Sequence, residues 1–267
     1  MVNFELKSRY NYEDLLQIVH ILRSPGGCPW DAEQTHDSIR REFLEEVYET
    51  LDALDRDDPE AMCEELGDVL MQVVFHARIE EEQGRFTAAD VVDGITKKMI
   101  YRHPHVFGTV QADTSEQVLV NWEALKRQEK GQRSTADAIE AVPHTLPALW
   151  RAEKINKKTR NAGFDWSDPM GALEKLEEEV RELRLALEQG EADTPHGIRE
   201  EIGDTLFIAA KVAQMSGIDP EDALHLACDK FDRRFRSVET AAAGRPLADF
   251  TEEELLSLWR AAKANES

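Results

Sequence analysis

The sequence has little of what builds disulfide frameworks, zinc sites or membrane spans. Its three cysteines, Cys28, Cys63 and Cys228, are an odd number and form no CxxC pair. Such usage argues against disulfides and fits the reduced thiols of a cytosolic protein. No apolar run approaches the length of a membrane helix, and the first sixteen residues lack the apolar stretch of a signal peptide. We therefore expect a soluble, cytoplasmic protein without a membrane partner.

Positive charge is also scarce. Lysine and arginine number 32 against 54 acidic residues, which gives a net charge of −22. This surplus would repel a phosphate backbone, so no nucleic-acid polymer is expected as a partner. A small anion remains possible where a local basic cluster or a bound cation reverses the sign. The GxxxxGK[ST] motif of P-loop enzymes and the GxSxG nucleophile elbow are both missing.

A carboxylate-rich pattern is present twice. Segments 45–49 (EEVYE) and 64–68 (EELGD) return in the same order as 178–182 (EEVRE) and 200–204 (EEIGD). Four later residues, Lys98, Arg102, Trp122 and Lys126, return as Lys230, Arg234, Trp259 and Lys263. The nearly constant offsets indicate a duplication. Segment 127–147 is polar and then interrupted by prolines, so we divide the chain into domains 1–134 and 135–267.

The spacing of apolar residues within each copy is helical. Ile39, Phe43, Val47, Leu51 and Leu54 recur every three or four positions and predict a helix from about residue 38 to 56. The second carboxylate helix is predicted to start at Asp58–Pro59 and to stop near Gly84. In the second copy, the first carboxylate helix is predicted to stop near Gly190, and the next is predicted to start at Thr194–Pro195. No convincing alternating β pattern occurs. The predicted class is all-α, as two tandem helical bundles.

The acidic residues favour a metal site over a solvated surface. Glu42, Glu45, Glu46 and Glu49 share one arc of their helix. Glu65 and Glu201, in contrast, fall among apolar residues of the partner helices. A carboxylate there is costly unless it is paired or binds metal. We therefore expect Glu65 and Glu201 to be buried and an all-oxygen site for Mg²⁺, or Mn²⁺ in its place. Ion pairs with arginine or lysine across the bundle are the alternative.

Two further features accompany these acids. Gly67 and Gly203 lie in the middle of predicted helices, which suggests that something approaches closely there. Lys230 and Arg234 are one helical turn apart, as are Lys98 and Arg102, and suit the gripping of phosphate oxygens. Trp259 with Lys263, and Trp122 with Lys126, could form a wall for base stacking, although a core tryptophan fits the sequence equally well.

Together these residues resemble the MazG family of nucleoside triphosphate pyrophosphohydrolases, whose motif is EExxE followed by ExxD. Segments 26–31 (GGCPWD) and 34–36 (QTH) also resemble the stretch that precedes this motif in two-domain members. The resemblance implies the following metal ligands: Glu179, Glu182, Glu201 and Asp204 in the second copy, and Glu46, Glu49, Glu65 and Asp68 in the first. It implies Glu178 as a base that orients water.

The resemblance also implies nucleotide contacts. In the second copy these are Lys175, Glu178, Glu200, Lys230, Arg233, Arg234, Trp259 and Lys263, and in the first Lys98, Arg102, Trp122 and Lys126. The first copy departs from the pattern, with Glu42 in place of Lys175 and Tyr101 in place of Arg233. Because this loses positive charge near the phosphates, we rank the C-terminal copy first as the active one.

The function implied is Mg²⁺-dependent hydrolysis of nucleoside triphosphates to monophosphate and pyrophosphate, with broad base specificity that includes non-standard nucleotides. The resemblance further implies a homodimer. One alternative is a non-catalytic module that binds nucleotides to regulate a partner, for which the acid-rich first copy is the candidate. A less favoured alternative is a ferritin-like dimetal protein, which needs two ExxH motifs, whereas only Glu33 and His36 form one.

Overall fold

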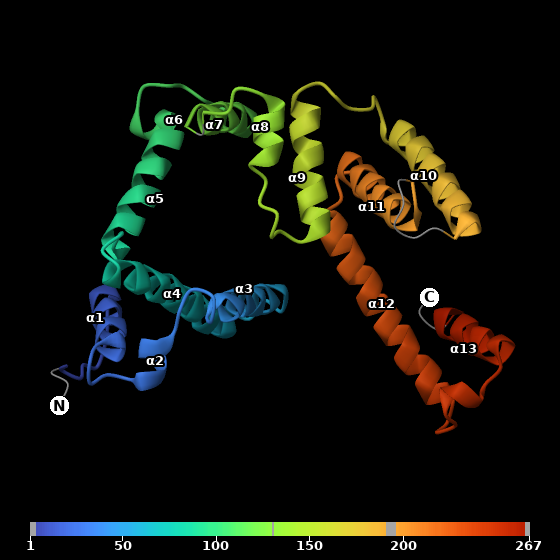
Figure 1. The fold of residues 1–267 in the computed structure, drawn as a ribbon, viewed down its shortest axis with the longest axis horizontal. Helices are drawn as coiled ribbons and strands as arrows, with labels where there is room; N and C mark the ends of the chain where they lie inside the picture. The colour runs from blue at the N-terminus through green and yellow to red at the C-terminus, as the bar shows by residue number, and fades with distance from the viewer. Residues whose placement is uncertain (1–3, 130, 191–195, 265–267) are drawn as a thin grey trace. The chain divides into compact units, whose positions relative to one another are not determined.

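The computed structural model describes residues 4–129, 131–190 and 196–264. Over these residues it contains thirteen α-helices, one 3₁₀ turn and no β-strand, which confirms the predicted all-α class (Figure 1). Within this described part, no helix combines the length and the apolar character needed to cross a membrane.

The chain separates into two compact units, Met1–Lys126 and Arg127–Ser267. The first holds α1 (Tyr12–Arg23), α2 (Pro29–Glu33), α3 (Arg40–Asp55), α4 (Pro59–Glu82), α5 (Ala88–Arg102), α6 (Pro104–Phe107) and most of α7 (Ser115–Glu129). The second holds α8 (Thr135–Glu140), α9 (Ala148–Asn161), α10 (Pro169–Gln189), α11 (Ile198–Met215), α12 (Pro220–Ala241), η1 (Leu247–Asp249) and α13 (Glu252–Ala264).

The stretch expected to be a linker is partly helical. Helix α7 continues to Glu129, and α8 begins at Thr135 behind a capping box in which Ser134 and Asp137 bond each other's backbone N–H groups. Lys130 lies outside the described residues. The domain boundary near residue 135 stays a prediction, since the compact units themselves divide between Lys126 and Arg127.

In the first unit α3 and α4 form the predicted carboxylate pair. Asp58 caps α4 by accepting a hydrogen bond from the N–H of Ala61 at 3.1 Å, and Pro59 occupies the first helical position, as expected. The apolar stripe of α3 is buried at its start, where Ile39 is 5 % exposed. At its other end Leu54 remains 58 % exposed, so this part of the stripe is not covered by the described chain.

In the second unit α10 and α11 form the equivalent pair. Helix α10 ends at Gly190, whose φ of +74° is the left-handed cap that glycine favours. The predicted start of α11 at Thr194–Pro195 is wrong, because the helix begins at Ile198. His196 has a φ of +62° and Gly197 is extended, and neither conformation continues a helix. Thr194 and Pro195 lie outside the described residues.

In each pair of carboxylate-bearing helices, polar contacts hold the two helices together near the N-terminus of the first one. In the second unit the fully buried Lys211 of α11 forms an ion pair with Asp165 at 2.6 Å, just ahead of α10. In the first unit His36, ahead of α3, contacts His76 and Glu80 of α4. These contacts hold the start of one helix against the carboxyl-terminal half of the other and thereby fix which carboxylates face each other.

Candidate metal and nucleotide site

The carboxylates of the second copy converge as predicted. Glu179 from α10 and Glu201 and Asp204 from α11 each place a carboxylate oxygen within 4.8 Å of the others. Glu179 and Glu201 are only 5 % and 3 % exposed, whereas Asp204 lies at the exposed edge. The predicted burial of Glu201 is therefore confirmed. Adjacent helices have brought three acidic groups together at one point, two of them out of contact with water.

The proximity of these acids changes their protonation. Burial raises the pKa of Glu201, and repulsion from Glu182 and Asp204 raises it further. Burial and the charge of Glu179 raise the pKa of Asp204 in the same way. Glu182, the fourth predicted ligand, lies outside the three-oxygen group but close enough to be felt by Glu201. The site thus disfavours full ionisation unless a cation compensates it.

Lys175 supplies part of that compensation. Its ammonium donates to Glu178 Oε1 at 2.7 Å and lies 2.8 Å from Glu179 Oε1. The two hydrogen bonds raise the pKa of Lys175, and the same contact lowers the pKa of Glu178. His196 adds a weaker partner, with its Nδ1 3.8 Å from Glu201 Oε1. Glu178 is therefore ionised, half-exposed and held beside the carboxylate group rather than within it.

The donor set fits a hard divalent cation. All three groups offer oxygen, which Mg²⁺ prefers, and no described cysteine or histidine joins the group to make the nitrogen and sulfur set that selects zinc. The open edge at Asp204 leaves room for water or phosphate ligands, which Mg²⁺ usually keeps. A divalent charge at this point would also relieve the repulsion that raises the pKa values of Glu201 and Asp204.

The first copy repeats the geometry with less compensation. Glu46, Glu49 and Glu65 lie within 4.8 Å of one another, and burial followed by repulsion from Asp68 raises the pKa of Glu46. Glu65 is half-buried rather than fully buried as expected, because the surface of α4 around it is only partly covered by described residues; burial still raises its pKa. Glu42 stands exposed in place of Lys175, and no ion pair to Glu46, Glu49 or Glu65 is found within the described part of the chain.

The mid-helix glycines do not meet a neighbour within the described chain. A Cβ at Gly67 or Gly203 would find no heavy atom within 4 Å, so the expected close approach is wrong for a single chain. The surrounding helix faces also stay open: Leu70 beside Gly67 is 41 % exposed, and Leu206 beside Gly203 is 51 % exposed. Neither glycine is explained by packing inside its own unit.

The predicted nucleotide contacts of the second copy are divided between two places. Lys175 and Glu200 lie at the carboxylate pair, where Glu200 accepts a hydrogen bond from the N–H of His196 at 2.7 Å. The others lie on the hairpin of α12 and α13: Lys230, Arg233, Arg234, Trp259 and Lys263. No hydrogen bond or ion pair among the described residues joins Lys230 to the carboxylates, so its role stays a prediction.

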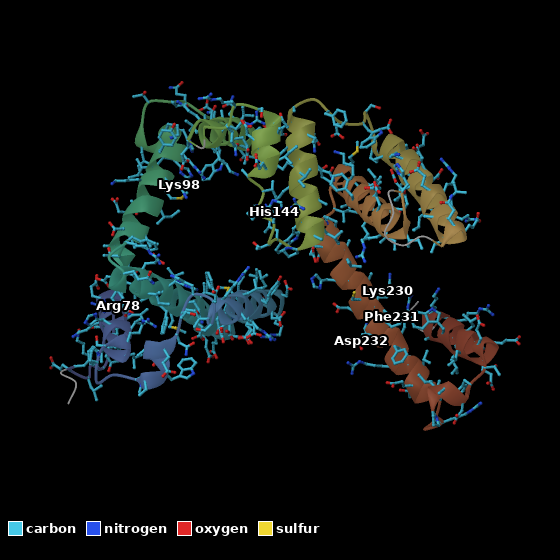
Figure 2. All side chains as sticks on the ribbon, in the orientation of Figure 1. Arg78, Lys98, His144, Lys230, Phe231 and Asp232 are labelled. Carbon is cyan, nitrogen blue, oxygen red and sulfur yellow. The ribbon has the colours of Figure 1, made fainter. Side chains whose placement is uncertain are left out.

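The α12–α13 hairpin carries an aromatic cluster that sequence reasoning missed in part. The ring of Phe231 lies 5.1 Å from that of the half-buried Trp259 and stacks on Phe235 at 6.0 Å. Figure 2 shows Lys230 and Phe231 next to each other on the part of α12 that runs beside α13. The four-residue spacing of the two phenylalanines was the signal available in the sequence.

In the first copy the matching residues lie on α5 and α7. Arg102 is only 8 % exposed, with its guanidinium 5.4 Å from the ring centre of Trp122. His103, also missed by sequence reasoning, meets that ring edge-on at 4.9 Å. Lys98 is exposed on α5, and Lys126 lies 3.9 Å from Glu123. Arg102 thus makes a buried contact with the indole ring in this structure.

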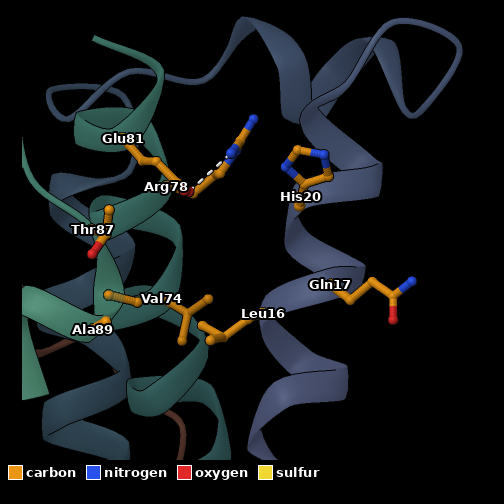
Figure 3. Close-up of a pocket in the computed structure, with 9 residues that line it drawn as sticks. Leu16, Gln17, His20, Val74, Arg78, Glu81, Thr87 and Ala89 are labelled. Carbon is orange, nitrogen blue, oxygen red and sulfur yellow. Dashed lines mark hydrogen bonds and ion pairs between the residues drawn. The ribbon is translucent and has the colours of Figure 1, made fainter. Parts of the chain in front are cut away.

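A separate cavity of about 430 Å³ lies between α1, α4 and the start of α5 (Figure 3). It is bordered by Leu16, His20 and Val74, and Arg78 at its rim forms an ion pair with Glu81 at 2.9 Å. None of the predicted site residues lines it. The carboxylate groups therefore remain the candidate site.

Comparison with known proteins decides the family. The MazG nucleotide pyrophosphohydrolase domain matches two segments, residues 34–107 and 168–238, which together make up more than half of the chain. The chain belongs to the MazG family. Each MazG segment contains one complete carboxylate group, and together they bear out the resemblance drawn from the two motifs.

Full-length relatives agree with this assignment. A protein of Thermotoga maritima named nucleoside triphosphate pyrophosphohydrolase/pyrophosphatase MazG is 42 % identical over 96 % of both chains. The nucleoside triphosphate pyrophosphohydrolase of Escherichia coli K12 is 42 % identical over 94 % of this chain and 97 % of its own. A Mycobacterium tuberculosis protein of the same name is 34 % identical over 92 % of this chain and 67 % of its own.

The MazG segments also divide the predicted site residues. Lys98 and Arg102 fall within the first segment, and Lys230 and Arg234 fall within the second. Four predicted contacts lie beyond the matched segments: Trp122, Lys126, Trp259 and Lys263. The roles of all these residues stay predictions, because the family match gives only the extent of each segment.

The raised pKa of Glu201 predicts a charge-dependent instability. A carboxyl whose pKa rises on folding keeps a proton that the unfolded chain releases above about pH 4.3, so its contribution to stability falls as the pH rises through the raised value. Without metal, Glu201→Gln should therefore be more stable than wild type at pH 8, with a smaller difference at pH 4. Urea unfolding in EDTA, followed by circular dichroism, measures this.

The exposed Glu177→Gln provides the control for loss of one negative charge on α10 and should shift stability little at either pH. If Glu201→Gln changes stability by the same amount at pH 4 and pH 8, the carboxylate repulsion inferred above is refuted.

Proposed function

We propose that the chain hydrolyses nucleoside triphosphates to monophosphate and pyrophosphate, that its C-terminal copy is the active site, and that Mg²⁺, or Mn²⁺ in its place, is the cofactor. The observation that carries the proposal is the group of Glu179, Glu201 and Asp204 with Lys175 beside it. The names of the full-length relatives support the reaction. The carboxylate donor set supports the metal.

Glu179, Glu182, Glu201 and Asp204 would hold the cation, which when bound draws electron density from the phosphoryl oxygens and offsets the charge of the transition state. Glu178 lies next to this group and would accept a proton from the attacking water. The bond from the water oxygen to the α-phosphorus forms as the bond to the bridging oxygen of pyrophosphate breaks. Lys230 and Arg234 would stabilise the departing pyrophosphate.

The ion pair with Lys175 controls the basicity of Glu178. In this structure the ammonium holds the Glu178 carboxylate at 2.7 Å and lowers its pKa, which makes it a weak base. An incoming triphosphate offers the same ammonium a more highly charged partner. Transfer of Lys175 to the phosphates would release Glu178, raise its basicity and leave it free to orient water. Substrate binding and activation of the base would thereby be coupled.

We extend the proposal to a broad range of bases, including non-standard ones. Support comes from the rings of Phe231 and Trp259, because stacking on an aromatic face accepts any base and reads no hydrogen-bond pattern.

The first prediction of this scheme concerns Glu178. Glu178→Gln should lower kcat by at least about 100-fold, the scale of general acid–base catalysis, while the affinity for Mg²⁺ and nucleotide stays measurable. Steady-state assays of pyrophosphate release, together with calorimetric binding, separate the two quantities. Glu177→Gln on the same helix should keep wild-type turnover. Retained turnover in Glu178→Gln would remove Glu178 from this role.

The second prediction concerns the reaction and its location. Full-length protein incubated with Mg²⁺ and a panel of nucleoside triphosphates should yield monophosphate and pyrophosphate, separated by anion exchange. EDTA should stop the reaction, and Mn²⁺ should restore it. Glu179→Ala should abolish it, whereas Glu46→Ala should retain most of it. Release of diphosphate and phosphate would refute attack at the α-phosphorus, and loss in Glu46→Ala alone would place the active copy in the first unit.

For the first copy we propose nucleotide binding without turnover. Glu46, Glu49 and Glu65 repeat the metal-binding geometry, yet the exposed Glu42 takes the place of Lys175. The acids can therefore bind a cation and its phosphates, but they lack the ammonium that the scheme requires. A ferritin-like dimetal site has less support, because Glu33 ends α2 and His36 lies in the loop that follows.

We also propose a homodimer, as the family resemblance implies. Support comes from the open faces around Gly67 and Gly203, where Leu70 and Leu206 are exposed at 41 % and 51 %. A mid-helix glycine costs about 1 kcal/mol relative to alanine, and close approach by a second copy would offset this cost. Exposed leucines on an open helix face are typical of interaction sites when they form part of an apolar patch.

Sedimentation equilibrium at micromolar concentration should give twice the mass of one chain. Leu206→Glu should shift the protein toward the monomer, because a charge would be buried in the interface. Leu6→Glu, at a leucine that is 85 % exposed, should leave the dimer intact. A wild-type monomer at these concentrations would contradict the proposal.

A further inference from the structure

A cavity of about 510 Å³ lies in the first unit, at the end of the α3–α4 pair where α5 begins. Its polar rim includes His36, Arg40 and His76, and aromatic rings of Phe43 and Phe86 line its walls. Small-molecule sites have volumes of this order and combine apolar walls with a few convergent polar groups. None of the predicted metal or nucleotide residues lines this cavity, so it is a separate feature of the first copy.

The polar rim is an ordered chain of groups. Glu80 Oε1 lies 2.5 Å from Nε2 of His36, and Nδ1 of His36 lies 2.7 Å from Nδ1 of His76. His36 donates its Nε2–H to Glu80. When the His36 ring is neutral, its Nδ1 accepts a hydrogen bond from His76. When the ring is charged, its Nδ1–H donates to His76. Arg85 also bonds Glu80 and keeps this carboxylate ionised. Among the described residues, Nε2 of His76 has no hydrogen-bond partner.

This arrangement leaves His76 suited to recognising a ligand. Burial, and then the charge of His36, lowers the pKa of His76, so the ring is neutral at physiological pH. Its Nε2 presents either an acceptor or a donor, according to which tautomer His36 imposes. The ring of Phe43 lies 5.5 Å from that of His76 at an angle of 55°. A planar heterocycle could therefore stack on Phe43 and meet a hydrogen-bonding edge at His76.

The cavity is aligned with the carboxylates of the first copy. Glu65, Asp68, Gln72 and His76 recur at intervals of three or four residues, so they share one face of α4. His76 is eight residues beyond Asp68, about 12 Å along a helix that rises 1.5 Å per residue. A ribose and its phosphates bridge a span of this order. Between them lies Gln72, which is 5 % exposed and whose Oε1 has no partner among the described residues.

The second copy shows that the fold does not require these groups. Because Glu65 corresponds to Glu201, His76 corresponds to Val212 and Glu80 to Ser216. Phe43 likewise corresponds to Leu176, since Glu45 corresponds to Glu178. The α10–α11 pair therefore forms without an imidazole chain at this place. The second copy holds its helices with the ion pair of Lys211 and Asp165 instead, so the imidazole chain beside the cavity is a feature of the first copy alone.

We propose that this cavity binds the heterocyclic base of a nucleotide whose phosphates are held, through a divalent cation, by Glu46, Glu49, Glu65 and Asp68. The proposal rests on the nucleotide-binding role proposed above for the first copy. It makes that copy selective, because His76 at the cavity offers a hydrogen-bonding edge to the base, whereas the rings on α12 and α13 offer only stacking. The first unit would thus sense particular nucleotides.

The test uses the full-length chain with Glu179→Ala, which removes the metal site of the second copy. Binding of α,β-imido nucleoside triphosphates with different bases is measured by calorimetry in the presence of Mg²⁺, with inorganic tripolyphosphate as the probe without a base. One nucleotide should bind per chain, more tightly than tripolyphosphate. Adding Phe43→Ala should weaken nucleotide binding about tenfold, as loss of one stacked base does, and leave tripolyphosphate unaffected.

His76→Gln, in the same Glu179→Ala background, should keep the fold and change the order in which the cavity prefers the bases. This variant tests the proposal even if Phe43→Ala does not fold. Phe107→Ala, at an exposed phenylalanine of α6 outside the cavity, should bind like its parent. Equal affinity for nucleotides and tripolyphosphate would overturn the proposal, as would nucleotide binding that neither cavity variant changes. Absence of pyrophosphate release by wild type would instead refute the catalytic function, and the binding data would still decide the cavity.

Discussion

Repulsion among carboxylates is the constraint on which the C-terminal unit depends. Glu179 and Glu201 are almost fully buried and have oxygens within 4.8 Å of each other and of Asp204. When ionised, these carboxylates oppose the packing of α10 against α11 at this point. The helices are held together beyond it by the buried ion pair of Lys211 with Asp165, and Lys175 neutralises part of the charge. A site strained in this way is stabilised by the cation it is suited to bind.

The two copies offset the repulsion among their carboxylates in different ways, and this difference bears on the function of each copy. The second copy places the ammonium of Lys175 beside its acids and holds its helix pair with the Lys211–Asp165 ion pair, so part of the negative charge of its acids is neutralised. The first copy has Glu42 where that ammonium would be and fastens its pair through His36, His76 and Glu80. Fastening by imidazoles leaves an adjacent cavity with hydrogen-bonding edges. Under the functions proposed above, duplication would have let one copy keep the chemistry while the other acquired recognition.

How much of this could be read from the sequence depends on how local each feature is. The helix pairs, the cap at Asp58 and the stop at Gly190 follow from spacing and capping, and all were predicted. The start of α11 was not, because the backbone of His196 and Gly197 overrides the cap expected at Thr194. The exposure of Glu65 depends on which neighbours cover α4. The contacts of Trp259 with Phe231, and of Asp165 with Lys211, join segments that no periodicity relates.

In both copies a mid-helix glycine lies directly beside the carboxylates. Gly67 and Gly203 sit one residue ahead of Asp68 and Asp204, about 100° away around the helix, so whatever approaches these open faces comes close to the carboxylates. If a second copy packs there, it fixes the rotation of α4 and α11 and thereby the direction in which the acids point. Assembly would then act on the metal site through helix rotation, without adding any ligand. Such a contact would require a residue without a side chain, which would explain why both copies keep a costly glycine at the same place in the helix.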